Sequence, residues 1–269
     1  MSLAITDDHR ALAETAADFL AKRDARAASR ALLDGAEETL PELWGELTQL
    51  GWLGLHLPEE YGGSGYGLEE LAVVVEQLGR ADAPGPFVPT VIVSALIAAA
   101  ADDATKAAWL PRLADGSLAA AAALDGDVAV EGGTATGSAG VVLGGALAGV
   151  FLVATGDDVA IVEVGDGVIV DVPTNLDPTR RSAKVTLDGA PATVIPGARQ
   201  ALVDLTRLVL SAEAIGLALE CTDMAAAYAK ERVQFGRVIG TYQAVKHHCA
   251  NMVVATELAT SAVWDAAKA

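Results

Sequence analysis

Hydrophobic periodicity changes twice along this chain, and this double change restricts the possible folds more than any other feature of the sequence. Apolar side chains recur at the three- and four-residue spacing of helices over residues 1–116. Glycine becomes frequent and short β-branched runs take over at 117–197, before the helical spacing returns at 198–269. We predict a mainly helical α+β protein with an N-terminal helical bundle, a small middle β-domain and the first part of a C-terminal helical domain.

The first part of the chain is predicted to form five helices, over Leu3–Leu33, Thr39–Leu50, Leu68–Leu78, Val88–Ala101 and Ala104–Leu113. Gly79 follows the last apolar turn of the third helix, where a glycine commonly ends a helix. The apolar run Phe87–Ala101 is shorter than the ~20 residues that cross a bilayer, so we expect a buried helix there.

The middle part is predicted to contain four strands, at 150–156, 159–165, 168–172 and 183–189. Gly-Asp pairs separate these short runs, which is typical of a small antiparallel sheet or barrel.

The last part begins with a long helical segment, Ala201–Glu231, which has no proline and a single glycine. Its stretch Leu205–Leu219 is apolar almost all the way round, and such a helix lies inside a bundle or an oligomer. A loop over Gln234–Gly240 leads to a second helix, Thr241–Ala269, which reaches the last residue without a cap, so we expect the natural chain to continue.

Charge and composition exclude several classes of function. With 18 Lys and Arg against 36 Asp and Glu, the net charge of −18 repels nucleic-acid phosphates and anionic lipids over roughly 8 Å. The 52% hydrophobic residues indicate a globular chain, and the 4% aromatic residues indicate a core of Ala, Leu and Val. The two cysteines, Cys221 and Cys249, and the polar N-terminus without a secretory signal favour a cytoplasmic location.

Other motifs have weak support. His247 and His248 point about 100° apart on a helix, so no metal site is expected beside Cys249. The glycines at 62–67 form a turn, because no strand precedes them as a dinucleotide fingerprint requires. Ser211 and Ser261 lack the surroundings of a nucleophile.

Three segments, taken in order, resemble the acyl-CoA dehydrogenase family. They are LPEEYGGSGYGLEELAVVVEQLGR (57–80), DLTRLVLSAEAIGLA (204–218) and ERVQFGRVIGTYQAVKHHCANM (231–252). The resemblance implies an FAD-dependent α,β-desaturation of an acyl-CoA thioester, in which a carboxylate removes the α-proton and the flavin accepts a hydride from the β-carbon. It also suggests an electron-transferring flavoprotein as electron acceptor.

The resemblance assigns Arg232, Gln234 and Phe235 to the FAD pyrophosphate and adenosine of a neighbouring subunit, and it places Gln243 near the adenosine. A guanidinium grips pyrophosphate oxygens bidentately, and Gly236 allows a close backbone approach. Considered without the resemblance, the arginines are solvated charges on a turn between helices.

Asp204 and Arg207 match the family's contacts to the CoA moiety, and their spacing places both on one helix face. A local ion pair is the alternative. No catalytic base is identifiable: Thr206 occupies the position where some members carry the glutamate. Glu213 lies seven residues further on, and a buried carboxylate paired with Arg or Lys of a partner helix is favoured there over a displaced base.

The predicted β-domain differs in sequence from the family in the two stretches that contact the flavin and the thioester in most members. Members usually have a T-E-P-x-x-G-S-D stretch and an N-G-x-K-x-W-I-T stretch, whereas residues 121–133 and 135–149 contain neither the tryptophan nor the lysine.

The sequence thus favours an acyl-CoA dehydrogenase whose activity resides in a longer chain or mixed oligomer, with CoA esters of steroid side chains as the hypothetical substrates. A non-catalytic partner subunit, which contributes FAD or acyl-CoA contacts to an active homologue, is the alternative. A scaffold that keeps the fold alone is disfavoured, because the R-x-Q-F-G loop is intact.

Overall fold

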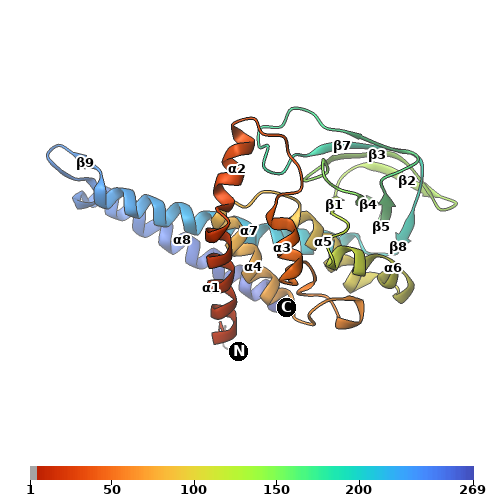
Figure 1. The fold of residues 1–269 in the computed structure, drawn as a ribbon, viewed down its shortest axis with the longest axis horizontal. Coiled ribbons are helices and arrows are strands. Elements are labelled where there is room, and N and C mark those ends of the chain that lie inside the picture. Colours follow the sequence, from red (N-terminus) through yellow and green to blue (C-terminus); the bar gives the residue numbers. More distant parts are fainter. Residues whose placement is uncertain (1–4) are drawn as a thin grey trace.

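The computed structural model describes residues 5–269 and places three parts side by side (Figure 1). A helical body holds the centre, a β-domain lies on one side of it, and a pair of long helices projects from the opposite side. The C-terminal residue lies back at the helical body, because the last helix returns from the far end of this projection.

The helical body contains six helices and two 3-10 turns. They are α1 (Asp7–Lys22), α2 (Ala25–Leu33), α3 (Leu43–Gln49), the turns Trp52–Gly54 and Glu59–Tyr61, α4 (Leu68–Ala81), α5 (Phe87–Ala100) and α6 (Asp103–Ala114). As predicted, α5 is a buried helix, because it packs between α6, α7 and the first strand of the β-domain.

The prediction of one helix over Leu3–Leu33 is wrong, because two helices occupy this segment. Asp24 separates α1 from α2 in the left-handed conformation (φ 46°), and its carboxylate accepts a hydrogen bond from the Ala27 N–H. An aspartate adopts this conformation more readily than most residues, and its side chain caps the second helix. Leu3 itself lies outside the described residues.

Two further predicted boundaries are wrong. The helix expected from Thr39 begins only at Leu43, because residues before Pro41 are restricted to extended backbone. Gly79 does not end α4, which continues to Ala81 and stops at Asp82 in the left-handed conformation (φ 50°). Gly79 instead lies where α4 crosses α7: a Cβ there would come within 2.1 Å of the Glu213 carbonyl oxygen.

The β-domain consists of two four-stranded sheets rather than one. One sheet has the order β1-β4-β5-β8 and the other the order β2-β3-β7-β6. The strands are β1 (Ala120–Ala123), β2 (Asp127–Glu131), β3 (Thr134–Val142), β4 (Val150–Thr155), β5 (Asp158–Glu163), β6 (Val168–Asp171), β7 (Ala183–Pro191) and β8 (Thr193–Ile195). The expectation of purely antiparallel pairing fails at β1 and β4, which are parallel.

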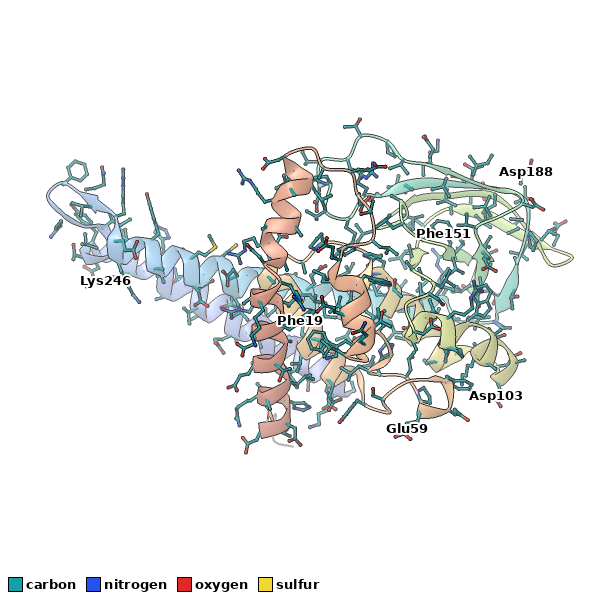
Figure 2. All side chains as sticks on the ribbon, viewed as in Figure 1. Phe19, Glu59, Asp103, Phe151, Asp188 and Lys246 are labelled. Atoms are coloured by element: carbon teal, nitrogen blue, oxygen red, sulfur yellow. The ribbon has the colours of Figure 1, made fainter. Side chains whose placement is uncertain are left out.

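The strand β4 is buried on both faces. Val150 and Leu152 belong to the core shared with the helices, whereas Phe151 and Val153 belong to the core between the two sheets. Figure 2 shows Phe151 in the interior of the β-domain. Burial on both sides explains why this strand reads as a continuous apolar run instead of alternating.

The last part of the chain is a helical hairpin. It comprises α7 (Arg199–Glu231), a β-hairpin of the two-residue strands β9 (Val233–Gln234) and β10 (Arg237–Val238), a 3-10 turn (Ile239–Thr241) and α8 (Gln243–Lys268). The inner ends of both helices pack on the body, and the outer parts, which we call the arm (217–258), extend away from it (Figure 1). No helix among residues 5–269 combines the length and apolar character that a membrane span requires.

Candidate functional site

A pocket of about 440 Å³ lies where α5, α7 and the edge of the β-domain meet. We call it the interhelical pocket. Its lining residues are largely apolar or glycine: Pro89, Ile92, Ala122, Leu124, Asp125, Gly126, Gly140, Val141, Leu143, Thr206 and Leu210. Asp125 and Thr206 are its polar side chains, and no lysine or arginine lines it.

Thr206 is the buried polar residue of this pocket. Its side chain is 7% exposed, and its Oγ1 has no hydrogen-bond partner among the described residues. Because Thr206 and Leu210 are one turn apart, they present the same face of α7 to the pocket.

Asp204 and Arg207 line a different cavity. They face a groove of about 870 Å³ between the first turns of α7 and the last turns of α8, together with Leu68 and Ala99. Their side chains lie 3.7 Å apart (Nη1 to Oδ1) and are exposed, and Asp204 also accepts from the Gln200 amide. The structure therefore places the two predicted CoA contacts in a different cavity from Thr206.

Glu213 is held in a bidentate ion pair with Arg180. The guanidinium nitrogens lie 2.6 and 2.9 Å from the two carboxylate oxygens, and both side chains are mostly buried. The partner comes from the loop between β6 and β7 and not from a helix. Arg180 also donates to the Gly85 carbonyl, so the pair joins the β-domain to the helical body. A carboxylate engaged in this way is poorly placed to accept a proton from a ligand.

The predicted dinucleotide residues lie at the far end of the arm. Arg232, Gln234, Phe235 and Gln243 are exposed, and we call the segment 232–243 the tip loop. Figure 1 shows β9 of this loop at the end of the molecule opposite the β-domain. Within one chain, the tip loop and the interhelical pocket are separate places.

The tip loop has several contacts of its own. Phe235 and Gly236 form a two-residue turn with positive φ angles (51° and 74°), which closes the β9–β10 hairpin. The Arg237 guanidinium lies 4.0 Å from the ring centre of Tyr242, whose hydroxyl donates to the Gln234 carbonyl. These contacts hold an exposed phenylalanine, 94% accessible, in a conformation that costs a non-glycine residue about 1 kcal/mol.

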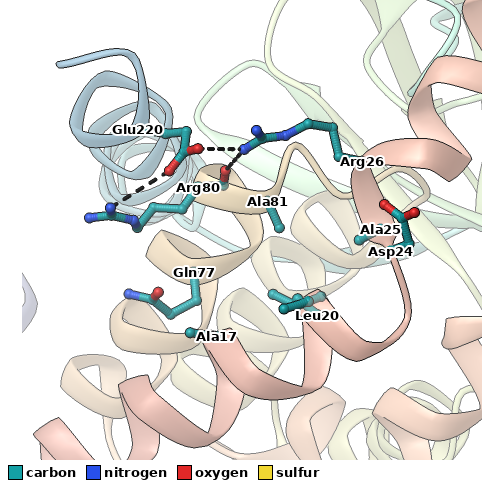
Figure 3. A pocket seen from close by; sticks show the side chains of 10 residues that line it. Ala17, Leu20, Asp24, Ala25, Arg26, Gln77, Arg80, Ala81 and Glu220 are labelled. Atoms are coloured by element: carbon teal, nitrogen blue, oxygen red, sulfur yellow. Dashed lines mark hydrogen bonds and ion pairs between the residues drawn. The ribbon is translucent and has the colours of Figure 1, made fainter. Parts of the chain in front are cut away.

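A further small pocket lies between α1, α2, α4 and α7, and its lining combines alanines and Leu20 with charged side chains (Figure 3). Arg26 and Arg80 both contact Glu220, and Arg80 also pairs with Asp223. Because each arginine already has a carboxylate partner, this network links helices rather than offering free positive charge.

Metal-binding side chains do not gather anywhere in the described part of the chain: no three His, Cys, Asp or Glu residues among 5–269 have suitable positions. His247 and His248 are exposed on α8.

An α-helical body, a two-sheet β-domain and the inner end of a helical hairpin meet at this largely apolar interhelical pocket. Family comparison specifies the class. The acyl-CoA dehydrogenase N-terminal domain matches residues 6–117, and the acyl-CoA dehydrogenase C-terminal domain matches residues 197–269. The chain belongs to the acyl-CoA dehydrogenase family.

Relatives of known sequence agree with this assignment. Acyl-CoA dehydrogenase FadE34 of Mycobacterium tuberculosis is 38% identical over 97% of this chain, which spans only 36% of FadE34. Acyl-CoA dehydrogenase IpdE2 of the same organism is 36% identical over 98% of the chain, which spans 76% of IpdE2.

Solved structures share the fold over nearly the whole chain. The ChsE4-ChsE5 complex from Mycobacterium tuberculosis superposes with a TM-score of 0.89 at 26% identity, covering 100% of this chain and 80% of that chain. A variant of the Tcur3481-Tcur3483 steroid ACAD gives 0.88 at 28% identity, covering 97% and 77%.

Acyl-CoA dehydrogenases generally use FAD. In this chain, the residues that suit the ring of FAD and those that suit its pyrophosphate lie in two separate places. The interhelical pocket is apolar enough for a flavin ring or an acyl chain, but it has no cation for a pyrophosphate. The tip loop has exposed arginines, Arg232 and Arg237, whose guanidinium groups suit a pyrophosphate, and it lies at the far end of the arm from this pocket.

Sequence reasoning did not identify most of the pocket lining. Pro89, Ile92 and Leu210 are apolar residues at ordinary core spacing, and nothing in the sequence distinguishes them from core residues. The stretches 121–133 and 135–149 were singled out for their departure from the family, and they do supply Asp125, Gly140 and Val141 to the pocket.

Proposed function

We propose that this chain is part of an FAD-dependent acyl-CoA dehydrogenase assembly that desaturates the acyl group of a CoA thioester. The observation that carries the proposal is the separation of the apolar pocket from the cationic tip loop within one chain. When bound, the flavin supplies a hydride acceptor. The interhelical pocket of this chain binds the acyl group and excludes water, and the groove beside Asp204 and Arg207 contacts the CoA moiety.

The α-proton acceptor comes from elsewhere in the assembly, because Thr206 has no basic group at neutral pH and Glu213 is paired with Arg180. An electron-transferring flavoprotein is the proposed acceptor of the electrons.

We further propose CoA esters of steroid side chains as the substrates. The similarity to a steroid ACAD supports this class, and so does a pocket bounded by small residues such as Ala122, Gly126 and Gly140. The test compares turnover of a steroid side-chain thioester with that of octanoyl-CoA by the complete assembly. Preference for the straight chain would remove the steroid assignment while leaving the desaturation.

The tip loop assignment has its own test. The variant Arg232→Ala removes a charge-assisted hydrogen bond worth about 1.5–3 kcal/mol, so the flavin content of the assembly should fall. The control is Arg30→Ala, since Arg30 is exposed on α2 and pairs only with Asp34. The measurement is flavin absorbance per chain at equal dilution. Unchanged flavin content in Arg232→Ala would contradict the role of the tip loop.

A non-catalytic partner subunit is the second candidate function. It is favoured by Thr206, which provides a hydroxyl where some family members carry the catalytic glutamate, and by the lack of cations in the pocket lining. In that case this chain lends its tip loop to an active homologue, and purified alone it should hold no flavin.

A further inference from the structure

The hydroxyl of Thr206 behaves differently from those of the other threonines in the long helices. Thr222 donates to the Ala218 carbonyl, Thr256 to the Met252 carbonyl and Thr260 to the Thr256 carbonyl, each four residues back. Such back-bonding is the usual way for a helical threonine to satisfy its hydroxyl. Thr206 makes no such bond, although it is 7% exposed and lies inside a regular helix.

An unpartnered buried hydroxyl costs free energy unless something else pairs with it. Thr206 and Asp125 are the polar side chains of the interhelical pocket, and Asp125 is exposed. Because a threonine in a helix has two accessible χ1 positions, rotation can turn the hydroxyl toward a ligand.

The rest of the lining restricts what that ligand can be. Ile92, Val141, Leu143 and Leu210 require an apolar body, since a polar one would leave its own groups unpaired. The carboxylate of Asp125, without a compensating cation in the lining, disfavours an anionic group.

We propose that Thr206 is the hydrogen-bonding contact of the interhelical pocket, and that its ligand is an apolar, uncharged group carrying an oxygen that pairs with the Thr206 hydroxyl. This inference rests on the proposed function, since it takes the ligand to be the acyl part of a CoA thioester. The oxygen is either a ketone or hydroxyl of the acyl body or the thioester carbonyl itself, and these two sources are separable by experiment.

The test measures equilibrium binding of three probes to the full-length chain by titration calorimetry. The probes are the CoA thioester of 3-(4-oxocyclohexyl)propanoic acid, the thioester of 3-cyclohexylpropanoic acid, and the CoA thioether that lacks the carbonyl of the latter. The variant Thr206→Val removes the hydroxyl and keeps the shape. Thr206→Ser keeps the hydroxyl. Thr222→Val is the matched control, because Thr222 is equally buried on the same helix (6% exposed) and lies outside the pocket.

We expect Thr206→Val to bind the oxo thioester about three- to tenfold more weakly than the wild type, which corresponds to one neutral hydrogen bond. Thr206→Ser and Thr222→Val should bind it as the wild type does. If only the oxo probe is weakened, the paired oxygen belongs to the acyl body; if both thioesters are weakened and the thioether is not, it is the thioester carbonyl.

Equal binding of all three probes by Thr206→Val and the wild type would overturn the inference and leave the proposed function intact. Failure of the wild type to bind any of the probes would overturn the proposed function, and the ligand assigned to Thr206 would fall with it. Thermal unfolding of each variant separates these outcomes from misfolding. We expect no loss of stability in Thr206→Val, because the hydroxyl it removes has no partner.

Discussion

At the scale of single residues, the Arg180–Glu213 ion pair allows a test of two roles for the Glu213 carboxylate, a structural one and that of the base that accepts the α-proton. If it is structural, Glu213→Gln should lower the free energy of unfolding by about 3 kcal/mol, because Arg180 is left as a mostly buried, unpaired charge. Urea denaturation of Glu213→Gln, Arg180→Met and the double variant gives the coupling energy. Full stability of Glu213→Gln combined with lost turnover would instead identify Glu213 as a base.

His56 gives a prediction about pH. Its Nε2 lies 3.1 Å from the Ser94 hydroxyl, and Nδ1 is buried without a hydrogen-bond partner among the described residues. Burial lowers the pKa of His56 from 6.5 to about 4. Between these values the unfolded chain binds a proton that the folded chain does not, so stability should fall as the pH falls from 6.5 to 4.

The loss attributable to His56 is about 3 kcal/mol over that range. His56→Gln, which cannot titrate and whose amide can still reach Ser94, should lose correspondingly less stability between pH 7 and pH 4.5. Urea denaturation at both pH values measures the difference. An identical pH dependence for the two proteins would show that His56 is not the group responsible.

Single residues were also where sequence reasoning was weakest. The pattern placed Thr206, Arg207 and Glu213 on one helix, but it could not show that each of them lines a different cavity. The partner of Glu213 comes from a loop 33 residues away in sequence, and no local periodicity reports such a contact.

At the scale of elements, the crossing of α4 and α7 depends on two glycines. Gly79 of α4 faces α7, and Gly216 of α7 faces α4. A Cβ on Gly216 would lie 1.9 Å from the Glu76 carbonyl oxygen, and one on Gly79 would lie 2.1 Å from the Glu213 carbonyl oxygen. These are backbone atoms, so the helices themselves would have to separate.

Gly216→Ala should therefore destabilise the protein by about 2 kcal/mol or more, although alanine is intrinsically the better helix former. Gly45→Ala is the matched control, because Gly45 lies in α3 with nothing within 4 Å of the added methyl group, and it should gain about 0.5–1 kcal/mol. Thermal or urea unfolding measures both changes. A stabilised Gly216→Ala would contradict the close crossing.

Elements were predictable where one pattern dominated. The strands β4, β5, β6 and β7 lie within two residues of their predicted ends, because their β-branched runs are bounded by turn residues. The strands β1, β2, β3 and β8 were missed. For β1 and β3 the reason is their content of Ala, Gly and Ser, which have no strand signature. The parallel pairing of β1 with β4 joins segments 30 residues apart, which spacing alone does not encode.

At the scale of the whole molecule, the arm exposes large apolar side chains. Met224, Tyr228, Val254 and Leu258 are each more than half exposed. They lie on the two helices of one hairpin, and exposed apolar surface is typical of an interface between chains.

We expect Leu258→Glu to shift the protein toward single chains by destabilising a contact between arms. Leu33→Glu is the matched control, because Leu33 is similarly exposed (55% against 67%) but lies at the end of α2, outside the arm. Light scattering at several concentrations measures the mass. A single-chain mass for the wild type, or an unchanged oligomer in Leu258→Glu, would argue against assembly through the arm.

The length of α7 also determines how far the tip loop lies from the interhelical pocket of the same chain. Its 33 residues extend about 50 Å at 1.5 Å per residue, and this span fixes how far the Phe235 turn reaches from its own pocket. Inserting one helical turn in α7 alone would put the Phe235 turn out of register with α8. Inserting one helical turn in both helices would move the Phe235 turn about 5.4 Å further from the pocket. If a second chain binds the Phe235 turn, its cleft must lie at the same distance. A change in the length of α7 is then compatible with binding only when α8 and the second chain change with it.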